Sequence, residues 1–197
     1  HARAPEEDGE RLTEPAQLGL TQVRDELQRG VVTARLPPPP SQPPTPKPAA
    51  AEPRRGEIAY FHACAGNYFD TATSKAAVLV LAHNGFDVSL PEQNCCGLPM
   101  QSNGEFKAAR EHAARNLNWL APYARRSIPI VGASTSCTLA LKSDYREILR
   151  VEHPEREHVA GQVYDISEFL LLLHQRGELR TDFRALPLEH TLIYHAP

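Results

Sequence analysis

Four segments of the chain carry apolar residues at the spacing of helices, and they are residues 70–85, 104–126, 138–149 and 165–177. In the longest segment the apolar positions recur every three or four residues, at Phe106, Ala109, Ala113, Leu117, Leu120 and Ala124, which predicts an amphipathic helix. Asp70 can cap the start of the first helix, and Gly85 stands where a left-handed residue commonly ends one. At the last predicted helix, Asp165 or Ser167 can cap the start, and Gly177 stands just past the end.

Four short apolar runs alternate with these helices and have strand character, and they are residues 57–62, 86–90, 128–133 and 191–196. Strands that alternate with helices indicate an α/β domain, because a helix carries the chain back between parallel strands and covers one face of their sheet. We therefore expect a mostly parallel sheet with flanking helices. In such a sheet the carboxyl ends of the strands lie at one edge, and ligands bind beyond it.

The first 56 residues have a different pattern and are predicted to form a tail or linker. Residues 37–53 contain nine prolines in seventeen positions, and proline lacks the amide proton that regular structure needs. This composition is typical of a disordered, polyproline-like spacer. Residues 57–197 form the predicted folded domain. Because the chain starts at His1 and ends on a strand-like run, we expect a fragment of a longer protein, with the domain truncated at its C-terminal end.

The charge and hydropathy of the chain argue against two classes of function. The 197 residues include 21 basic and 24 acidic side chains, and this near balance leaves no electrostatic footprint for nucleic acid. No run of eighteen apolar residues occurs, so the sequence shows no membrane-spanning segment of its own. No secretory apolar region opens the chain, and we expect a cytoplasmic protein.

Four cysteines carry the candidate chemistry, and Cys95 and Cys96 are adjacent. Adjacent side chains on an extended segment point to opposite faces, and neighbouring cysteines rarely form an unstrained disulfide. In a reducing compartment, cysteines too few for a disulfide scaffold are more often metal ligands or catalytic groups. Cys64 follows the first predicted strand, the pair follows the second, and Cys137 follows the third. We therefore expect all four thiols at one edge of the sheet, where a metal centre could use them.

The residues around these cysteines resemble a known family. The segments "FHACAGNYFD", "NCCGLPMQSNGEFKAAREHAARN", "ASTSCTLALKSDY", "DISEFL" and "YHAP" occur in the order typical of the cysteine-rich CCG domain. The family includes iron–sulfur subunits of anaerobic glycerol-3-phosphate dehydrogenase, heterodisulfide reductase, and lactate and glycolate oxidases. The resemblance covers roughly residues 57–197, which makes it much more specific than a lone CCG triplet.

The resemblance implies an electron-transfer subunit that binds an iron–sulfur cluster. Carried over by position, the cluster ligands are Cys64, Cys95, Cys96 and Cys137, and Gly97 lets the loop backbone approach the cluster closely. Family members pass electrons from a flavin-containing dehydrogenase subunit toward quinone or another acceptor. Substrate chemistry is then expected on the partner subunit, and any peripheral association with the inner face of the cell membrane would come through partners.

The sequence departs from the family pattern in three places. Ser134 replaces the first cysteine of a CxxC that many relatives have, so a four-thiolate [4Fe–4S] centre fits better than a five-thiolate noncubane cluster. The ferredoxin motifs that commonly precede the domain are absent from these 197 residues, and so is a second CCG copy. Both absences agree with the expected truncation.

Other interpretations use the same four cysteines. Four thiolates around zinc would give a zinc-stabilised interaction module without a redox role, although the tight CxxC hairpins of many zinc sites do not occur here. A thiol–disulfide centre at Cys95 and Cys96 is a third interpretation. A buried structural thiol is the simplest interpretation of any single cysteine, but four in register at strand ends favour metal binding.

Five further side chains lie near the expected site. His62 and His195 stand late in strand-like runs, and either could bind the metal or donate to a sulfur; ordinary partly buried histidines have the same pattern. Asn94, Ser134 and Ser136 could donate hydrogen bonds to the sulfurs and tune the reduction potential. Loop residues that satisfy turn backbone have the same composition.

Overall fold

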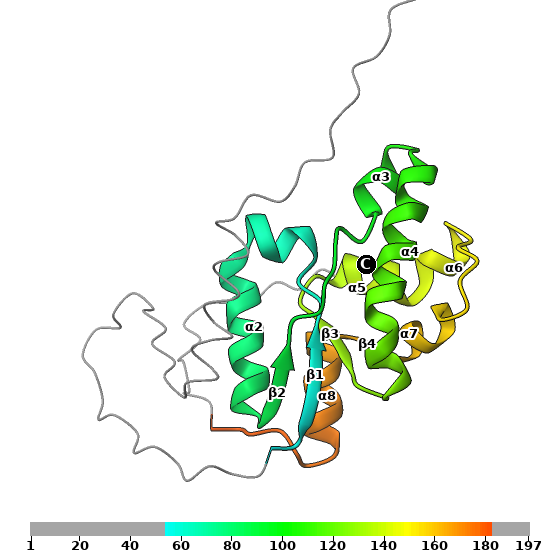
Figure 1. The fold of residues 1–197 in the computed structure, drawn as a ribbon. Coiled ribbons are helices and arrows are strands. Elements are labelled where there is room, and N and C mark those ends of the chain that lie inside the picture. Colours follow the sequence, from blue (N-terminus) through cyan, green and yellow to red (C-terminus); the bar gives the residue numbers. More distant parts are fainter. Residues whose placement is uncertain (1–53, 183–197) are drawn as a thin grey trace, which may run out of the picture.

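The computed structural model describes residues 54–182, which form a parallel sheet with helices on both of its faces (Figure 1). The strand order is β2-β1-β3-β4, and each neighbouring pair is parallel. The strands are β1 (Gly56–Tyr60), β2 (Phe86–Ser89), β3 (Ile130–Gly132) and β4 (Val163–Asp165). The expected α/β class with a parallel sheet and flanking helices is confirmed. The proline-rich segment lies outside the described residues.

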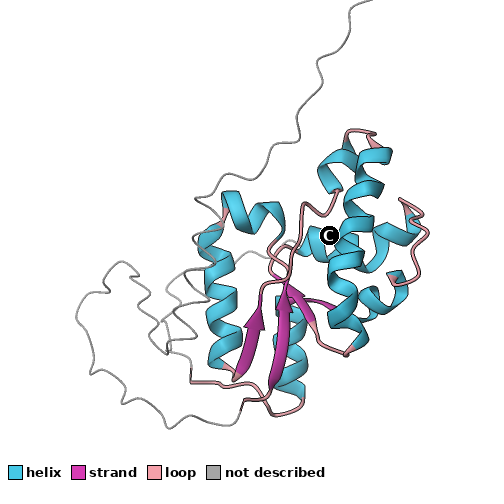
Figure 2. Cartoon of the chain, in the orientation of Figure 1, coloured by secondary structure: helices cyan, strands magenta, loops and turns pink. Residues whose placement is uncertain are grey.

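Helical segments connect the strands and follow the last one (Figure 2). They are the π-helix η1 (Ala65–Phe69), α2 (Thr71–His83), α3 (Leu98–Ser102), α4 (Phe106–Arg125), α5 (Thr135–Leu139), the π-helix η2 (Ala140–Asp144), α6 (Tyr145–Glu147), α7 (Arg156–Gln162) and α8 (Ile166–Gln175). The four predicted helices are confirmed. The third begins a few residues earlier than expected, and it consists of α5, η2 and α6 in succession.

The helix ends follow the capping residues that the sequence contains. Asp70 caps α2 by accepting from the Thr73 backbone N–H at 3.1 Å. Asp165 caps α8 in a capping box, in which it accepts from the Ser167 N–H at 2.9 Å and the Glu168 side chain accepts from the Asp165 N–H at 3.3 Å. These bonds satisfy amide groups that a helix start leaves without an intrahelical partner.

Three of the four predicted strands are confirmed, each shorter than its apolar run. The run 191–196 lies outside the described residues. The fourth strand of the described sheet is β4, which the pattern did not predict. It has three residues between α7 and α8, and this length is too short for a period of two to be recognised.

Side chains alternate across β1 and divide the core into two layers. Ile58 and Tyr60 pack with α2 and α8 on one face of the sheet, whereas Ala59 faces α4 and α7 on the other. Leu117 and Leu120 on α4 are fully buried in the second layer. Burial of each such side chain contributes about 1.5–3 kcal/mol to folding. None of the helices among residues 54–182 is both long and apolar enough to cross a membrane.

We predict that Asp165→Ala destabilises the domain by about 1–2 kcal/mol, because α8 loses its N-cap. The Thr135 hydroxyl, which donates to Asp165 at 2.9 Å, loses its acceptor as well. Asp165→Asn is the matched control and should stay close to wild type, since asparagine caps helices as well as aspartate does. Denaturant unfolding measures both changes, and equal stability of the alanine variant and wild type would contradict the assignment.

Candidate metal centre

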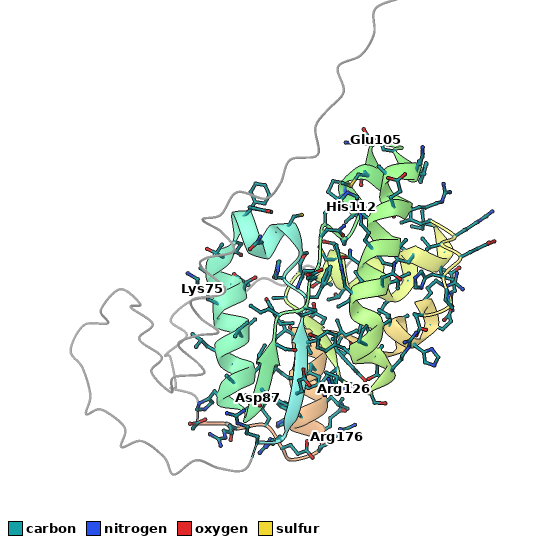
Figure 3. All side chains as sticks on the ribbon, in the orientation of Figure 1. Lys75, Asp87, Glu105, His112, Arg126 and Arg176 are labelled. Carbon is teal, nitrogen blue, oxygen red and sulfur yellow. The ribbon has the colours of Figure 1, made fainter. Side chains whose placement is uncertain are left out.

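The carboxyl ends of β1, β2 and β3 lead into the segments that carry the four cysteines. Cys64 precedes η1, Cys95 and Cys96 precede α3, and Cys137 lies within α5. In Figure 3, Glu105 and His112 lie at this end of the sheet, whereas Asp87, Arg126 and Arg176 lie at the opposite end. The three segments come together at one edge, as the sequence predicts.

The four thiols meet in two close pairs. The Cys64 and Cys95 sulfurs are 3.6 Å apart, and the Cys96 and Cys137 sulfurs are 3.3 Å apart. All four cysteines are free thiols. The adjacent cysteines therefore turn to different partners, as expected of neighbouring side chains on an extended segment.

The two pairs differ in their exposure. Cys96 and Cys137 are buried, with 1% and 6% of their surface exposed. Cys64 and Cys95 are only partly buried. The site therefore has one buried pair of thiols and one partly exposed pair.

Hydrogen bonds within each pair shift the thiol pKa values in opposite directions. The Cys64 thiol donates to Cys95, which lowers the pKa of Cys95 and raises that of Cys64. The Cys96 thiol donates to Cys137 and lowers the pKa of Cys137 to about 7, while the pKa of Cys96 is raised. Two of the four sulfurs are therefore favoured as thiolates, the form that binds metal.

Gly97 directly follows the cysteine pair and begins the turn into α3. Its φ of 93° lies in the left-handed region, which favours glycine. A Cβ at this position would also lie 3.1 Å from the carbonyl oxygen of Ala109 on α4. Glycine is thus required by its own backbone and by the close approach of α4. Its backbone N–H also contributes to the lowered pKa of Cys95.

Polar side chains form hydrogen bonds that connect the loop before α3 to neighbouring segments. Gln93 links this loop to the Cys64 segment, because its Nε2 donates to the Tyr60 carbonyl at 3.0 Å and its Oε1 accepts from the Ala63 N–H at 3.1 Å. Asn116 and Tyr145 contact the backbone at the cysteine pair from the other side, and both are fully buried.

The sequence patterns did not identify these three residues as part of the site. A signal was present for Asn116 and Tyr145, which place polar groups among the apolar positions of predicted helices. Buried polar side chains are usually hydrogen-bonded, so such a position indicates a specific partner in the core. No such pattern marked Gln93, because it lies in a loop.

The remaining residues that the sequence predicted near the site differ in the groups that they contact. The Ser134 hydroxyl donates to the Cys137 sulfur at 3.2 Å, and Ser136 contributes a hydrogen bond that lowers the pKa of Cys137. The Asn94 side chain, in the orientation that satisfies it, donates to the Cys95 carbonyl at 3.0 Å.

The two candidate histidines are His62 and His195. His62 shares a hydrogen bond with the Ala63 carbonyl at 2.8 Å, and burial lowers the pKa of His62. His195 lies outside the described residues.

The donor set is four cysteine sulfurs, which is the ligand chemistry of [4Fe–4S] clusters and of structural zinc sites. Ser134 is placed to supply a hydrogen bond at one of these sulfurs. Within residues 54–182, no group of three or more histidine, cysteine, aspartate or glutamate side chains is arranged to hold a single metal ion. By its chemistry the donor set fits an iron–sulfur group.

The part of the chain that carries the four thiols is similar to a known cysteine-rich domain. The family model of the CCG cysteine-rich domain matches residues 58–142, a segment that includes all four cysteines. The resemblance that the sequence carries is thus confirmed over this segment.

Individual relatives are also similar to this chain. One subunit of anaerobic glycerol-3-phosphate dehydrogenase from Escherichia coli K12 is 32% identical over 108 residues, which cover 53% of this chain and 27% of the relative. One subunit of fumarate reductase (CoM/CoB) from Methanothermobacter marburgensis is 30% identical over 141 residues, or 71% of this chain and 25% of the relative. Lactate utilization protein A from Halalkalibacterium halodurans is 26% identical over 139 residues, or 68% of this chain and 55% of the relative.

The chain spans about a quarter of the length of the first two relatives and about half of the third. No solved structure gives a significant match to this chain.

We predict that Gly97→Ala destabilises the domain by about 1–2 kcal/mol, the usual cost of a left-handed backbone for an L-residue. The contact of the new Cβ with the Ala109 carbonyl adds to this cost. Gly161→Ala on α7 is the matched control, because a Cβ there meets no atom within 4 Å. Thermal unfolding of the metal-free protein should show a loss only for Gly97→Ala. A loss of equal size in both variants would contradict the argument.

Proposed function

We propose that Cys64, Cys95, Cys96 and Cys137 hold a [4Fe–4S] cluster and that this chain is an electron-transfer subunit of an oxidoreductase complex. The observation that carries the proposal is the meeting of four free thiols, from the three segments that follow β1, β2 and β3, at one edge of the sheet. Four thiolates are the usual ligand set of such a cluster. All four cysteines of the chain take part in this site.

The relatives support the same class of function. Two of them are named as subunits of a dehydrogenase and of a fumarate reductase, which are oxidoreductases. The CCG domains that this sequence resembles bind iron–sulfur clusters. On this basis the partner is a flavin-containing dehydrogenase subunit, and the final acceptor is quinone or another oxidant.

When bound, the cluster supplies a one-electron redox centre. The chain's own residues hold it and control its surroundings. Cys96 and Cys137 shield one side from water, because they are buried in the layer that contains α4. Cys64 and Cys95 leave the other side partly exposed, and this is the side through which a partner subunit exchanges electrons. Ser134 donates to Cys137 and stabilises negative charge on that sulfur.

The second candidate is a zinc-stabilised interaction module, because four cysteine sulfurs are also the ligand chemistry of structural zinc sites. As placed in residues 54–182, the thiols would have to rearrange to hold a single zinc ion. Metal analysis separates the two candidates. Protein purified or reconstituted without oxygen should contain iron and acid-labile sulfide in comparable amounts and should be coloured. Stoichiometric zinc in colourless protein would refute the iron–sulfur proposal.

We predict that Cys95→Ser and Cys96→Ser each lower the iron content of the reconstituted protein or alter the paramagnetic spectrum of its reduced form. Serine is nearly isosteric with cysteine but is a harder and much less acidic ligand, so a centre with only four thiolates is weakened. Ser102→Ala on α3 is the control and should keep full iron. Full iron and an unaltered spectrum in both serine variants would show that the pair is not part of the ligand set.

We predict that Ser134→Ala lowers the midpoint potential of the bound cluster, because a hydrogen bond to a ligand sulfur favours the more negative, reduced state. A hydrogen bond of about 1 kcal/mol corresponds to roughly 40 mV for one electron. A redox titration monitored by visible absorption measures the change. Ser143→Ala on η2 is a suitable control, and equal potentials in wild type and Ser134→Ala would show that Ser134 does not tune the cluster.

A further inference from the structure

We infer that Asn116 and Tyr145 are positioning residues, which act as one hydrogen-bonded unit to set the backbone of residues 94–96 and hence the directions of the two adjacent thiols. The inference deepens the proposed function and rests on it for the identity of the bound metal. It concerns how the chain places its own sulfurs.

The cysteine loop needs partners from elsewhere for its backbone groups. Residues 90–96 belong to no helix or strand, yet Cys96 is 1% exposed. Buried N–H and C=O groups almost always have a hydrogen-bond partner, because water cannot reach them. A loop in this position therefore depends on side chains.

Asn116 and Tyr145 supply these partners to three consecutive residues. The Asn116 Oδ1 accepts from the Asn94 N–H at 2.9 Å, and its Nδ2 donates to the Cys95 carbonyl at 3.1 Å. The Tyr145 hydroxyl donates to the Cys96 carbonyl at 3.0 Å. Each cysteine thus has its carbonyl group held by a different side chain.

The two side chains are also bonded to each other. The Asn116 Nδ2 donates to the Tyr145 hydroxyl oxygen at 3.2 Å, so the hydroxyl both accepts and donates. Asn116 comes from α4 and Tyr145 from α6, and both are fully buried. The loop is therefore fixed to two helices through a network with little freedom to rearrange, because satisfied buried networks are rigid.

This arrangement fixes the orientation of the peptide groups at the pair. With both carbonyl groups held, the Cys95 sulfur turns toward Cys64 and the Cys96 sulfur turns toward Cys137. A metal site requires its ligands to be placed within about 0.5 Å, and this placement depends on residues behind the ligands. Asn116 and Tyr145 take that role through the backbone.

The test uses Tyr145→Phe, which removes one hydroxyl and keeps the ring. The Cys96 carbonyl loses its donor, and Asn116 loses an acceptor. Tyr123→Phe is the matched control, because Tyr123 lies on α4 and is a partly buried tyrosine packed against the same core. Iron release from the reconstituted protein to a chelator is measured together with the spectrum of the reduced cluster and the melting temperature of the metal-free protein.

Tyr145→Phe should release iron about tenfold faster than wild type, the effect of losing one buried hydrogen bond at the ligand loop. Its reduced spectrum should shift, while Tyr123→Phe matches wild type in both measurements. A merely structural role would lower the melting temperature of Tyr145→Phe and leave its iron release and spectrum at wild-type values, and this outcome would overturn the inference. Asn116→Ser, which keeps a smaller hydrogen-bonding group, is the second variant if Tyr145→Phe does not fold, and the same criteria apply to it.

The metal content of the wild-type protein separates the two proposals. If it binds zinc instead of iron and sulfide, the proposed function fails. The positioning role is then tested by zinc release to a chelator, which Tyr145→Phe should again accelerate about tenfold. Equal zinc release from Tyr145→Phe and wild type would overturn the positioning role as well.

Discussion

Parallel pairing of β1 with both β2 and β3 is the constraint on which the cysteine site depends. Because the three strands point the same way, the segment after each one emerges at the same edge of the sheet. Reversal of any one strand would carry its cysteines to the opposite end of the domain. The helices on both faces stabilise this arrangement by covering the apolar side chains of the central strands.

The site combines a rigid, buried half with a partly exposed half. Cys96 and Cys137 lie in the core together with the polar groups that orient them, whereas Cys64 and Cys95 lie nearer the surface. In the proposed redox role both features have a use. Burial controls the potential of the redox centre and excludes water, and an exposed side gives a partner a short path for electron exchange.

Burial of a polar group costs free energy unless the group has a hydrogen-bond partner. In this domain two buried polar side chains bond to backbone groups of the loop that carries the cysteine pair. Asn116 and Tyr145 satisfy the backbone of the cysteine pair, and Gln93 joins that loop to the end of β1 and to the segment after it. The same hydrogen bonds that stabilise the loops therefore also set the geometry of the thiols. Stability and ligand placement have a common origin in this domain.

The sequence by itself determined the class of fold, the helix caps and the set of four thiols. Helical and strand periodicity, Asp70 at a helix start and the position of each cysteine after a strand are local features, and local features can be recognised along the chain. The strand order did not follow from them, because pairing depends on contacts between residues far apart in sequence. β4 was missed for a related reason, since three residues carry no measurable period.

Only the tertiary structure decided which thiols pair, which of them are buried and which side chains hold their loops. Cys95 meets Cys64 across a separation of 31 residues, and Asn116 meets Tyr145 across 29. The first contact joins the segments that follow β1 and β2, the second joins α4 to α6, and no periodic pattern encodes either of them. The sequence therefore determined which groups are present, and the fold determined the distances at which they act.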